Sequence, residues 1–478
     1  MSEVVEYDAI AIGTGSAMNI VDAMLHWNPG LRVAVIDKDE PGGICLTRGC
    51  IPSKILLYSA DLVRIIQDSN RFGVEAEIHD INFKKVMDRM RRMIGREIEM
   101  IREGLSAAPN IDYYHDVAEF IEPYKLKVGG KVITSRLIFL CLGSKPFAPP
   151  INGLKETGFL TSDTVLKLER LPKRLGVIGG SYIGLEYGHF FSAMGSEVTV
   201  VEMMPRILPM EEPEISSVAE KVMGKYMNIF TNKRVVEVEK EGNSKLMVAE
   251  DLTSGERSVF EVDEVLVATG RAPNTDILKP EKGGIEVDSK GWIITNEYLE
   301  TSQPGVYAFG DANGKYLFKH VANYESMVVY YNAVLNKRIK VDYHAVPHAV
   351  FTYPEIASVG LREKDAIKKY GEKNVLIGLA RYEDTAKGEA MGVKDYFVKV
   401  ILRKDSREIL GAHIIGPYAS ILIQEIVNLM YTSDKTYTPI LRGMHIHPAL
   451  SEVVERAFFN LMEPSQYHHV IREHFHWI

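Results

Sequence analysis

Two separate stretches of the chain contain the same parts in the same order. Each has an apolar run, a glycine-rich turn, a segment of helical character, a second apolar run and an acidic residue. The turns occupy residues 13–18 and 179–184, and the acids are Asp37 and Glu202. This order is typical of nucleotide-binding βαβ units with parallel strands. It predicts an α/β fold with two Rossmann-like dinucleotide-binding domains.

The first turn has the residues that a dinucleotide needs. Gly13 and Gly15 allow the backbone to turn tightly beneath a pyrophosphate at a helix N-terminus, and Asp37 is placed to accept a ribose hydroxyl. Met18 stands at the third glycine position, which predicts a slightly different spacing of helix and strand. One such turn is weak evidence, because similar turns occur where nothing binds. Two copies, each followed by an acid, predict two cofactors.

The second turn indicates which nicotinamide would bind. Glu202 favours NAD over NADP, because a carboxylate accepts the ribose 2′-hydroxyl and repels a 2′-phosphate. Arg206 keeps NADP open as an alternative. Ser181 replaces the middle glycine and adds a side chain where the pyrophosphate approaches, which predicts weaker nicotinamide binding.

Cys45 and Cys50 lie five positions apart in a chain of 478 residues that has three cysteines. That scarcity excludes a structural disulfide framework, and a zinc site would need about four Cys or His ligands. The pair therefore predicts a redox-active disulfide. Five residues of regular helix would separate the Cα atoms by about 8.5 Å, whereas a disulfide rarely spans more than about 7 Å. We therefore expect the glycine-rich segment 41–54 to distort the start of a helix.

Composition narrows the function further. Hydrophobic residues make up 46% of the chain, charged residues 25%, and the net charge is −8. These values predict a soluble protein of several domains, without the basic excess of nucleic-acid binders. No apolar run reaches the roughly 18 residues of a membrane span. The first residues lack a secretory signal pattern, which predicts a cytoplasmic protein.

The segment 445–452 contains a candidate base. A dithiol must lose a proton before its sulfur attacks a disulfide, and histidine titrates in the right range. Pro448 suits the first position of a helix, which would place His447 at the helix entrance and Glu452 just over one turn inside. Glu452 could then orient the imidazole, with His445 in a supporting role. A structural histidine at a helix end is the alternative.

These motifs resemble the flavoprotein disulfide reductases of the class I pyridine nucleotide-disulfide oxidoreductase family, and most closely its dihydrolipoamide dehydrogenases. The resemblance covers nearly the whole chain. It is carried by the first glycine turn, residues 41–54, the second unit as far as Glu186, and residues 268–274, 307–311 and 445–452. It implies FAD on the first unit, NAD on the second and a C-terminal α+β dimerisation domain. The implied domains are residues 1–147 for FAD, 148–270 for NAD, 271–345 for a central domain that completes the FAD site, and 346–478 for the interface.

The resemblance also implies roles for individual residues. Asp311 would contact the ribityl or phosphate part of the flavin, and Lys54 would lie against the isoalloxazine ring, paired with Glu186. Tyr182 resembles the gating tyrosine of related reductases, although an aromatic that packs on a helix start is an equal alternative. The implied cofactor-binding residues are Gly13, Gly15, Ser16, Asp37, Lys38, Gly43, Lys54, Ala118, Gly143, Asp311, Lys319 and His320 for FAD, and Gly179, Ser181, Tyr182, Ile183, Gly184, Glu186, Glu202, Val235 and Gly270 for NAD.

The activity that the resemblance implies is oxidation of dihydrolipoamide to lipoamide through Cys45, Cys50 and FAD, with reduction of NAD. The dihydrolipoamide would be carried by a lipoyl protein of a 2-oxoacid dehydrogenase or glycine-cleavage complex. His447 and Glu452 would act on the disulfide of the other subunit, so the enzyme would be a symmetric homodimer.

Three alternatives stay open. The first is reduction of a glutathione-like or coenzyme A-like disulfide, although glutathione-type reductases favour NADPH, which Glu202 opposes. The second is reduction of mercuric ion, although mercuric reductases have a C-terminal cysteine pair and no cysteine follows Cys141 here. The third is a flavin-containing docking subunit that has lost turnover. The chain retains Cys45, Cys50, His447 and Glu452 together, which opposes this alternative.

The chain departs from the family pattern at two positions. Ile44 and Leu142 each stand where a threonine is usual, so two possible flavin contacts are lost. Cys141 lies in an apolar run and is expected to be an inert strand residue. The histidine-rich tail 467–478 lacks the spacing of a metal site, and we expect a dimer-surface or partly mobile tail.

Overall fold

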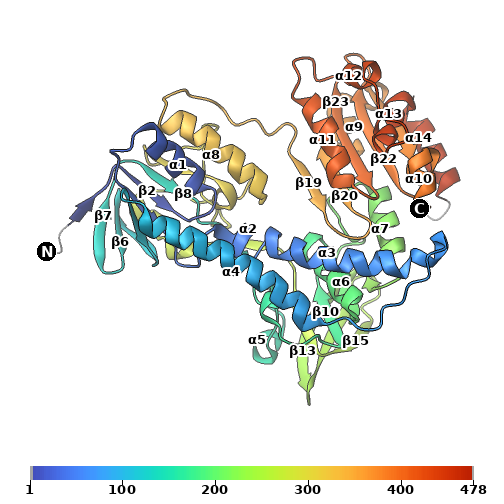
Figure 1. Cartoon of the computed structure of the whole chain (residues 1–478), viewed down its shortest axis with the longest axis horizontal. Helices are drawn as coiled ribbons and strands as arrows, with labels where there is room; N and C mark the ends of the chain where they lie inside the picture. Colours follow the sequence, from blue (N-terminus) through green and yellow to red (C-terminus); the bar gives the residue numbers. More distant parts are fainter. Residues whose placement is uncertain (1–3, 476–478) are drawn as a thin grey trace.

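The first glycine turn lies at the edge of a parallel sheet in the N-terminal lobe of the computed structural model, which describes residues 4–475. The strands run in the order β18, β8, β2, β3, β4. They are β2 (Ala9–Ile12), β3 (Val33–Ile36), β4 (Ile111–Tyr114), β8 (Ile138–Leu140) and β18 (Val306–Ala308). β2 and β3 are buried along their whole length, as expected of unbroken apolar runs in a parallel sheet. Helices α1 (Ala17–Trp27) and α8 (Lys319–Ala333) lie side by side in this lobe (Figure 1).

A smaller sheet accompanies the parallel one, in the order β1, β7, β6, β5. Its strands are β1 (Val4–Glu6), β5 (Ala118–Glu122), β6 (Lys125–Val128) and β7 (Lys131–Thr134). The long helix α4 (Phe83–Ala107) also belongs to this part of the chain. Strand β18 follows the second glycine unit in sequence but pairs with β8 of the first sheet. Residues near 306 therefore return to the N-terminal lobe.

The second glycine unit forms a lobe of its own, the lowest in Figure 1. A parallel sheet has the order β12, β11, β10, β16. Its elements are β10 (Arg174–Ile178), α6 (Tyr182–Met194), β11 (Glu197–Val201), α7 (Pro213–Met223), β12 (Asn228–Phe230) and β16 (Glu264–Val267). An antiparallel sheet of β13 (Lys233–Glu241), β14 (Ser244–Asp251) and β15 (Arg257–Val262) is attached to it. The two predicted Rossmann-like units are therefore both confirmed.

The C-terminal lobe is an antiparallel sheet with helices, which confirms the predicted α+β domain. The strand order is β19, β20, β23, β22, β21, β24. The strands are β19 (Pro347–Val350), β20 (Ile356–Gly360), β21 (Val375–Arg381), β22 (Phe397–Arg403), β23 (Ile409–Ile415) and β24 (Leu461–Met462). The helices are α9 (Glu363–Tyr370), α10 (Ala386–Ala390), α11 (Ala419–Met430), α12 (Thr438–Arg442), α13 (Ser451–Phe459) and α14 (Pro464–His474).

The described part of the C-terminal tail differs from the tail that we expected. Residues 464–474 form α14, and Tyr467 and Phe475 are buried. Aromatic side chains thus fix this segment to the lobe, which leaves a dimer-surface tail as the alternative of the two that stays a prediction. Residues 476–478 lie outside the described residues.

Several further elements lie between the lobes. They are α2 (Gly43–Thr47), α3 (Cys50–Gln67), α5 (Leu154–Thr157), and the pair of strands β9 (Ser144–Pro146) and β17 (Arg271–Pro273). Among the helices in residues 4–475, none has both the length and the apolar character to cross a membrane.

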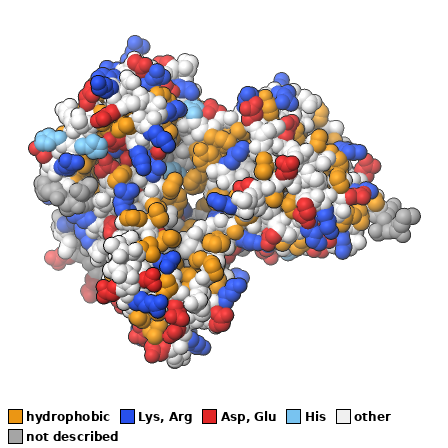
Figure 2. Space-filling model, turned by 180° about the vertical axis from the view of Figure 1, so that it is seen from behind, with side chains coloured by type: hydrophobic (Ala, Val, Ile, Leu, Met, Phe, Trp, Pro, Cys, Tyr) orange, Lys and Arg blue, Asp and Glu red, His pale blue; other side chains and the backbone are white. Residues whose placement is uncertain are grey.

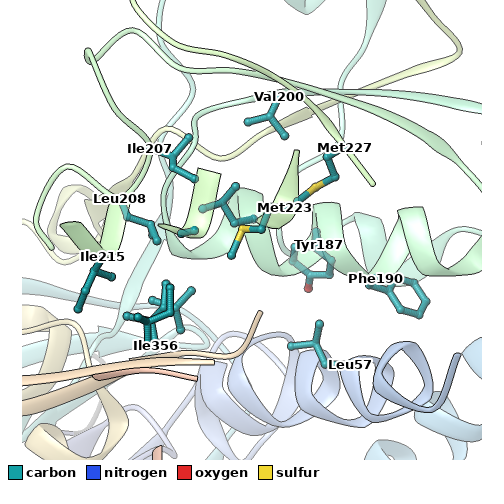
Figure 3. Close-up of a cluster of buried hydrophobic side chains, with 14 of the residues drawn as sticks. Leu57, Tyr187, Phe190, Val200, Ile207, Leu208, Ile215, Met223, Met227 and Ile356 are labelled. Carbon is teal, nitrogen blue, oxygen red and sulfur yellow. The ribbon is translucent and has the colours of Figure 1, made fainter. Parts of the chain in front are cut away.

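One buried cluster joins the three lobes around the helix that begins at Cys50. Figure 3 shows Leu57 of α3 below Tyr187 and Phe190 of α6, with Met223 of α7 and Ile356 of β20 in the same cluster. All five side chains are almost fully buried. Because close-packed protein interiors resist displacement, these buried contacts hold α3 in a fixed position against both the second unit and the C-terminal lobe.

Candidate functional site

The two cysteines lie on either side of a break between helices. Cys45 belongs to α2, and Cys50 is the first residue of α3. Gly49 has φ −125° and ψ −121°, which interrupts the helix. A Cβ there would lie 2.8 Å from the carbonyl oxygen of Ile44 and 3.1 Å from the Cα of Cys45. The predicted distortion is therefore confirmed, and the missing side chain of Gly49 allows the two cysteines to approach each other.

Cys45 and Cys50 are both free cysteines in the structure, and their pairing as a redox-active disulfide stays a prediction. A hydrogen bond joins the two side chains. This bond from Cys45, together with the positive charge of Lys54, lowers the pKa of Cys50 to about 7, although burial opposes it. The same hydrogen bond and burial raise the pKa of Cys45. Cys50 is thus the thiol that ionises first.

Lys54 stands one turn after Cys50 and forms the predicted ion pair. Its Nζ lies 2.7 Å from Oε2 of Glu186, which is buried on α6. The backbone N–H of Phe351 donates to Oε1 of Glu186 at 3.0 Å, and the Lys54 ammonium lies 4.6 Å from the centre of the Phe351 ring. The cation next to the dithiol is therefore held by groups from two other lobes.

A cavity of about 740 Å³ opens over the dithiol and brings most of the predicted site residues together. Its lining includes Gly13, Gly15, Ser16, Asp37, Lys38, Gly43, Cys45, Cys50, Lys54, Ala118, Gly143, Tyr182, Ile183, Glu186, Asp311, Lys319 and His320. Other predicted residues are outside its lining: Gly179, Ser181, Gly184, Glu202, Val235, Gly270, His447 and Glu452. Ile44, Cys141 and Leu142 also line the cavity, so the two departures replace hydroxyls with apolar walls.

The first turn fits the pyrophosphate of FAD. Gly13 has φ +104°, a backbone conformation that favours glycine. A Cβ on Gly43 would lie 2.6 Å from the Cα of Gly15, so the first glycine turn and the segment at Gly43 are closely packed. Ser16 precedes α1 without capping it, and its hydroxyl accepts from Lys319 Nζ at 2.9 Å. The free N–H groups at this helix start are the donors that a phosphate requires.

Two acids complete this side of the cavity. Asp37 accepts from the backbone N–H of Thr14 at 2.9 Å, which holds the turn closed. Asp311 accepts from the Ser144 hydroxyl at 2.5 Å and lies 3.9 Å from Arg271. Burial raises the pKa of Asp311, and this side chain caps no helix. Asp311 lines the cavity, and its contact to the flavin stays a prediction.

The second turn has the same local design. Glu202 is buried at the end of β11, and its carboxylate accepts from Gly180 N–H at 2.6 Å and from Met204 N–H at 2.7 Å. A Cβ on Gly184 would lie 2.0 Å from the carbonyl oxygen of Gly179. Ser181 precedes α6 without a side-chain cap, which leaves the helix start open for a phosphate.

Several residues around the cavity were not predicted from the sequence. Phe318, His348 and Phe351 line it, and Glu211 is bonded to His348 just behind the lining. They come from different lobes, and Phe351 is 165 positions from the Glu186 carboxylate that it contacts. No local motif marks them, so the sequence offers no signal for these contacts.

His447 and Glu452 form the predicted pair, away from the cavity of their own chain. His447 Nδ1 lies 2.9 Å from Oε1 of Glu452, and the N–H of Ala449 donates to Oε2 at 3.1 Å. These hydrogen bonds, first that from His447, lower the pKa of Glu452. The His447 side chain is 69% exposed, so its second nitrogen faces outward.

The helix start after His447 was predicted wrongly. A cis peptide bond precedes Pro448, and α13 begins only at Ser451. Pro448 therefore belongs to a turn, which the Glu452 carboxylate closes through Ala449. His445 lies nearby and is partly buried, 3.0 Å from Glu425 and 3.4 Å from Glu455, and its supporting role stays a prediction.

Known proteins share this fold and sequence along almost the whole chain. The chain is 35% identical to mycothione reductase of Mycobacterium tuberculosis over 95% of its length and 99% of that protein. It is 34% identical to dihydrolipoyl dehydrogenase of Synechocystis, with 96% and 99% covered. The solved structure of the HOCl-induced flavoprotein disulfide reductase RclA from Escherichia coli matches with a TM-score of 0.82, 27% identity, and 95% and 99% coverage.

Family profiles match both halves of the architecture. Residues 7–334 match the pyridine nucleotide-disulphide oxidoreductases, and residues 346–458 match the dimerisation domain of the same family. With the cysteine pair, the two glycine turns and these matches in agreement, the chain belongs to the class I pyridine nucleotide-disulphide oxidoreductases, flavoenzymes whose cofactors are FAD and NAD(P).

Proposed function

We propose that this enzyme oxidises dihydrolipoamide, carried on a lipoyl protein of a 2-oxoacid dehydrogenase or glycine-cleavage complex, and reduces NAD. The supporting observation is Glu202. Its carboxylate is buried and fixed by two backbone N–H groups at the end of β11, where the ribose of a nicotinamide dinucleotide would lie. A fixed negative charge there opposes the 2′-phosphate of NADP. A preference for NAD favours dithiol oxidation, because the disulfide reductases of the glutathione type favour NADPH.

The proton steps of this proposal belong to His447. Because Glu452 occupies Nδ1, the outward Nε2 is the atom that takes a proton from a substrate thiol. The substrate thiolate attacks Sγ of Cys45 in the oxidised pair, the Cys45–Cys50 bond breaks, and the electron pair stays on Cys50. The second substrate thiol then attacks the substrate sulfur bonded to Cys45 and closes the lipoamide disulfide. Its proton passes to the released Cys45, and His447 keeps the proton of the first thiol.

Cys50 is suited to hold the released electron pair. Its lowered pKa, about 7, leaves about half of the Cys50 thiol ionised at neutral pH, and the Lys54–Glu186 pair fixes the cation beside it. The chemistry supplied by bound FAD is two-electron acceptance from this dithiol and hydride donation to NAD. Lys54, Glu186 and Asp311 would hold the flavin in the cavity.

A second copy of the chain would bring His447 to the dithiol. Apolar side chains of Ile51, Tyr58, Leu62 and Ile65 are exposed at helical spacing along α3. The face in Figure 2 also shows hydrophobic side chains around the hollow in the middle of the molecule. Such faces are typical of surfaces that another chain covers. They support a symmetric homodimer with two shared sites.

The test compares substrates and half-reactions on the purified flavoprotein. Dihydrolipoamide with NAD should turn over faster than any other pair of substrates. His447→Ala should lower dithiol oxidation by about 10²–10⁴-fold, because the general base is lost. The same variant should retain reduction of the flavin by NADH, measured by stopped-flow absorbance. Unchanged dithiol turnover in His447→Ala would remove the proposed role.

Reduction of a small disulfide is the second candidate, because the chain is as similar to a mycothione reductase as to a dihydrolipoyl dehydrogenase. The same assays separate the two. A higher kcat/KM for a low-molecular-weight disulfide with either nicotinamide than for dihydrolipoamide with NAD would favour this candidate.

A further inference from the structure

Arg48 is the one charged residue between the two cysteines, and it has no role in the chemistry described above. It directly follows α2 and precedes Gly49, where the helix breaks. Its Nη2 donates to Oδ2 of Asp39 at 2.6 Å, and its Nε lies 3.1 Å from Oδ2 of Asp163. The three side chains are 23%, 33% and 25% exposed, so water screens these pairs less than pairs on an open surface. One guanidinium therefore joins the end of α2 to two carboxylates.

The two carboxylates are anchored in different units of the fold. The backbone N–H of Asp39 donates to Oδ1 of Asp37 at 3.0 Å, and Lys38 pairs with the Asp39 carboxylate at 2.7 Å. Leu160, three residues before Asp163, forms a β-bridge to β16 of the second sheet. Asp39 thus belongs to the first dinucleotide unit and Asp163 to the second. Through Arg48, both units hold the end of α2.

Packing contributes little to the position of α2. None of its five side chains is fully buried, whereas α3 buries side chains along its length. Leu46 contacts the core but stays partly exposed. Arg48 lines the cavity over the dithiol and also a second cavity of about 670 Å³, which is bounded by α4 and residues 163–167. A cavity offers no atoms to pack against. The position of Cys45 on α2 therefore depends on the ion pairs of Arg48 more than on packing.

We propose that Arg48 is a positioning residue that holds Cys45 within bonding distance of Cys50 and thereby stabilises the disulfide of the redox pair. If α2 moved freely in the dithiol, closing the disulfide would have to order it again, at a cost in conformational entropy. The two ion pairs order α2 before the sulfurs bond. The inference rests on the redox pair of the proposed function, and it is independent of which dithiol and which nicotinamide the enzyme uses.

The test is a redox titration of the purified flavoprotein against glutathione without oxygen. Two glutathione molecules give two electrons and two protons to the Cys45–Cys50 disulfide and become one glutathione disulfide. Free thiols are trapped with iodoacetamide and measured by mass spectrometry of the cysteine peptides. Arg48→Met removes both ion pairs, so the equilibrium should shift about three- to tenfold towards the dithiol, the usual net effect of a hydrogen bond. For a two-electron couple this raises the midpoint potential by about 14–30 mV.

Two further variants test whether both acids are needed. Arg48→Lys has a single side-chain nitrogen and reaches one acid, so its midpoint should lie between those of wild type and Arg48→Met. Asp163→Asn keeps the shape of the side chain and removes the charge in the second unit, so it should also be intermediate. Because Asp163 acts only through Arg48, the double variant of Arg48→Met and Asp163→Asn should equal Arg48→Met alone.

Arg91→Met is the matched control. Arg91 on α4 lines the same second cavity, is 29% exposed and pairs with Asp88 and Glu169. Its guanidinium also donates to the carbonyl oxygens of Leu166 and Leu168. These bonds join α4, rather than α2, to the second unit. The Arg91→Met enzyme should therefore keep the wild-type midpoint.

Three results would overturn the proposal. They are an Arg48→Met midpoint equal to that of wild type, an equal shift in Arg91→Met, and additive shifts in the double variant. A wild-type enzyme in which glutathione disulfide forms no bond between Cys45 and Cys50 would refute the redox pair of the proposed function, and the role of Arg48 with it. If Arg48→Met fails to fold, Arg48→Lys and Asp163→Asn still decide.

Discussion

Cys45 and Cys50 are chemically different because of what each thiol touches. Cys50 receives a hydrogen bond from Cys45 and lies near the Lys54 cation, whereas Cys45 donates and is disfavoured as an anion. This difference favours Cys45 as the sulfur that the substrate attacks and Cys50 as the sulfur that holds the released electron pair.

A titration of the reduced protein checks this assignment. Cys50 should be largely protonated and slow to react with iodoacetamide below pH 6, and its reactivity should rise with a midpoint at about pH 7. Cys45→Ala removes the hydrogen-bond donor, so the Cys50 midpoint should move to higher pH. Modification of the Cys50 peptide is measured by mass spectrometry. A midpoint in Cys45→Ala at or below that of wild type would contradict the assignment.

Sequence motifs predicted the pairs whose members lie in strong local patterns. Lys54 with Glu186 and His447 with Glu452 are both paired in the structure. Glu211 and His348 were missed because their contact joins two lobes and neither residue belongs to a motif. Roles in cofactor binding stay predictions for the residues that line the cavity.

At the scale of elements, the break between α2 and α3 sets the geometry of the redox pair. The glycines before Cys45 and after Arg48 indicated a distorted helix start, because regular helix spacing is too long for a disulfide. The division into two helices could not be predicted, since it depends on the close contact of Gly49 with Ile44 and Cys45.

Gly49→Ala tests this contact. A Cβ would press on the Ile44 carbonyl and the Cys45 Cα, so the cysteines should move apart. We expect a loss of about 1–3 kcal/mol in the free energy of unfolding, as for overpacking, and a disulfide that is easier to reduce. Urea unfolding and a redox titration against glutathione measure the two effects.

Gly95→Ala is the control for the glycine change. Gly95 lies inside α4 with open space around its Cβ position. Alanine there should stabilise by about 0.5–1 kcal/mol. Equal effects of the two substitutions would show that the contact at Gly49 is unimportant.

At the scale of the whole molecule, a buried charge cluster joins the second unit to the C-terminal lobe. Lys399 on β22 is fully buried, with its Nζ 3.3 Å from Glu212, 3.2 Å from Glu214 and 2.7 Å from Glu363. Burial alone would lower the pKa of Lys399, but the three carboxylates outweigh it and raise the pKa. Glu212 and Glu214 belong to the second unit, whereas Lys399 and Glu363 belong to the C-terminal lobe. The Lys399 ammonium therefore binds the two lobes together.

Lys399→Met should leave these carboxylates buried without a cation. We expect a loss of about 3–5 kcal/mol at pH 8, the usual cost of breaking a buried pair. In the variant the folded protein would bind more protons than the unfolded chain, so its stability should rise as the pH falls towards 5. Urea unfolding at several pH values measures this. Lys404→Met, at a half-exposed pair with Glu463, should change little, and equal losses in the two variants would contradict the role of burial.

The division into two dinucleotide units and an α+β lobe could be predicted because each unit has its own periodic pattern. The return of β18 to the first sheet is set by pairing between residues far apart in the chain, and this order of strands has no local signature. Packing between the lobes could not be predicted from the sequence either, because it also joins residues that are far apart in the chain.

The cavity has a consequence for how the protein is made. Its walls come from Gly13 near the start of the chain and from Gln424 near the end. At ~10 residues per second, a ribosome needs about 40 s to synthesise the chain between them. The first glycine turn can fold early, but the enclosure around a flavin exists only once the last lobe has emerged. A chain that stalls before the C-terminal lobe would therefore leave the ribosome without the complete lining of the cavity.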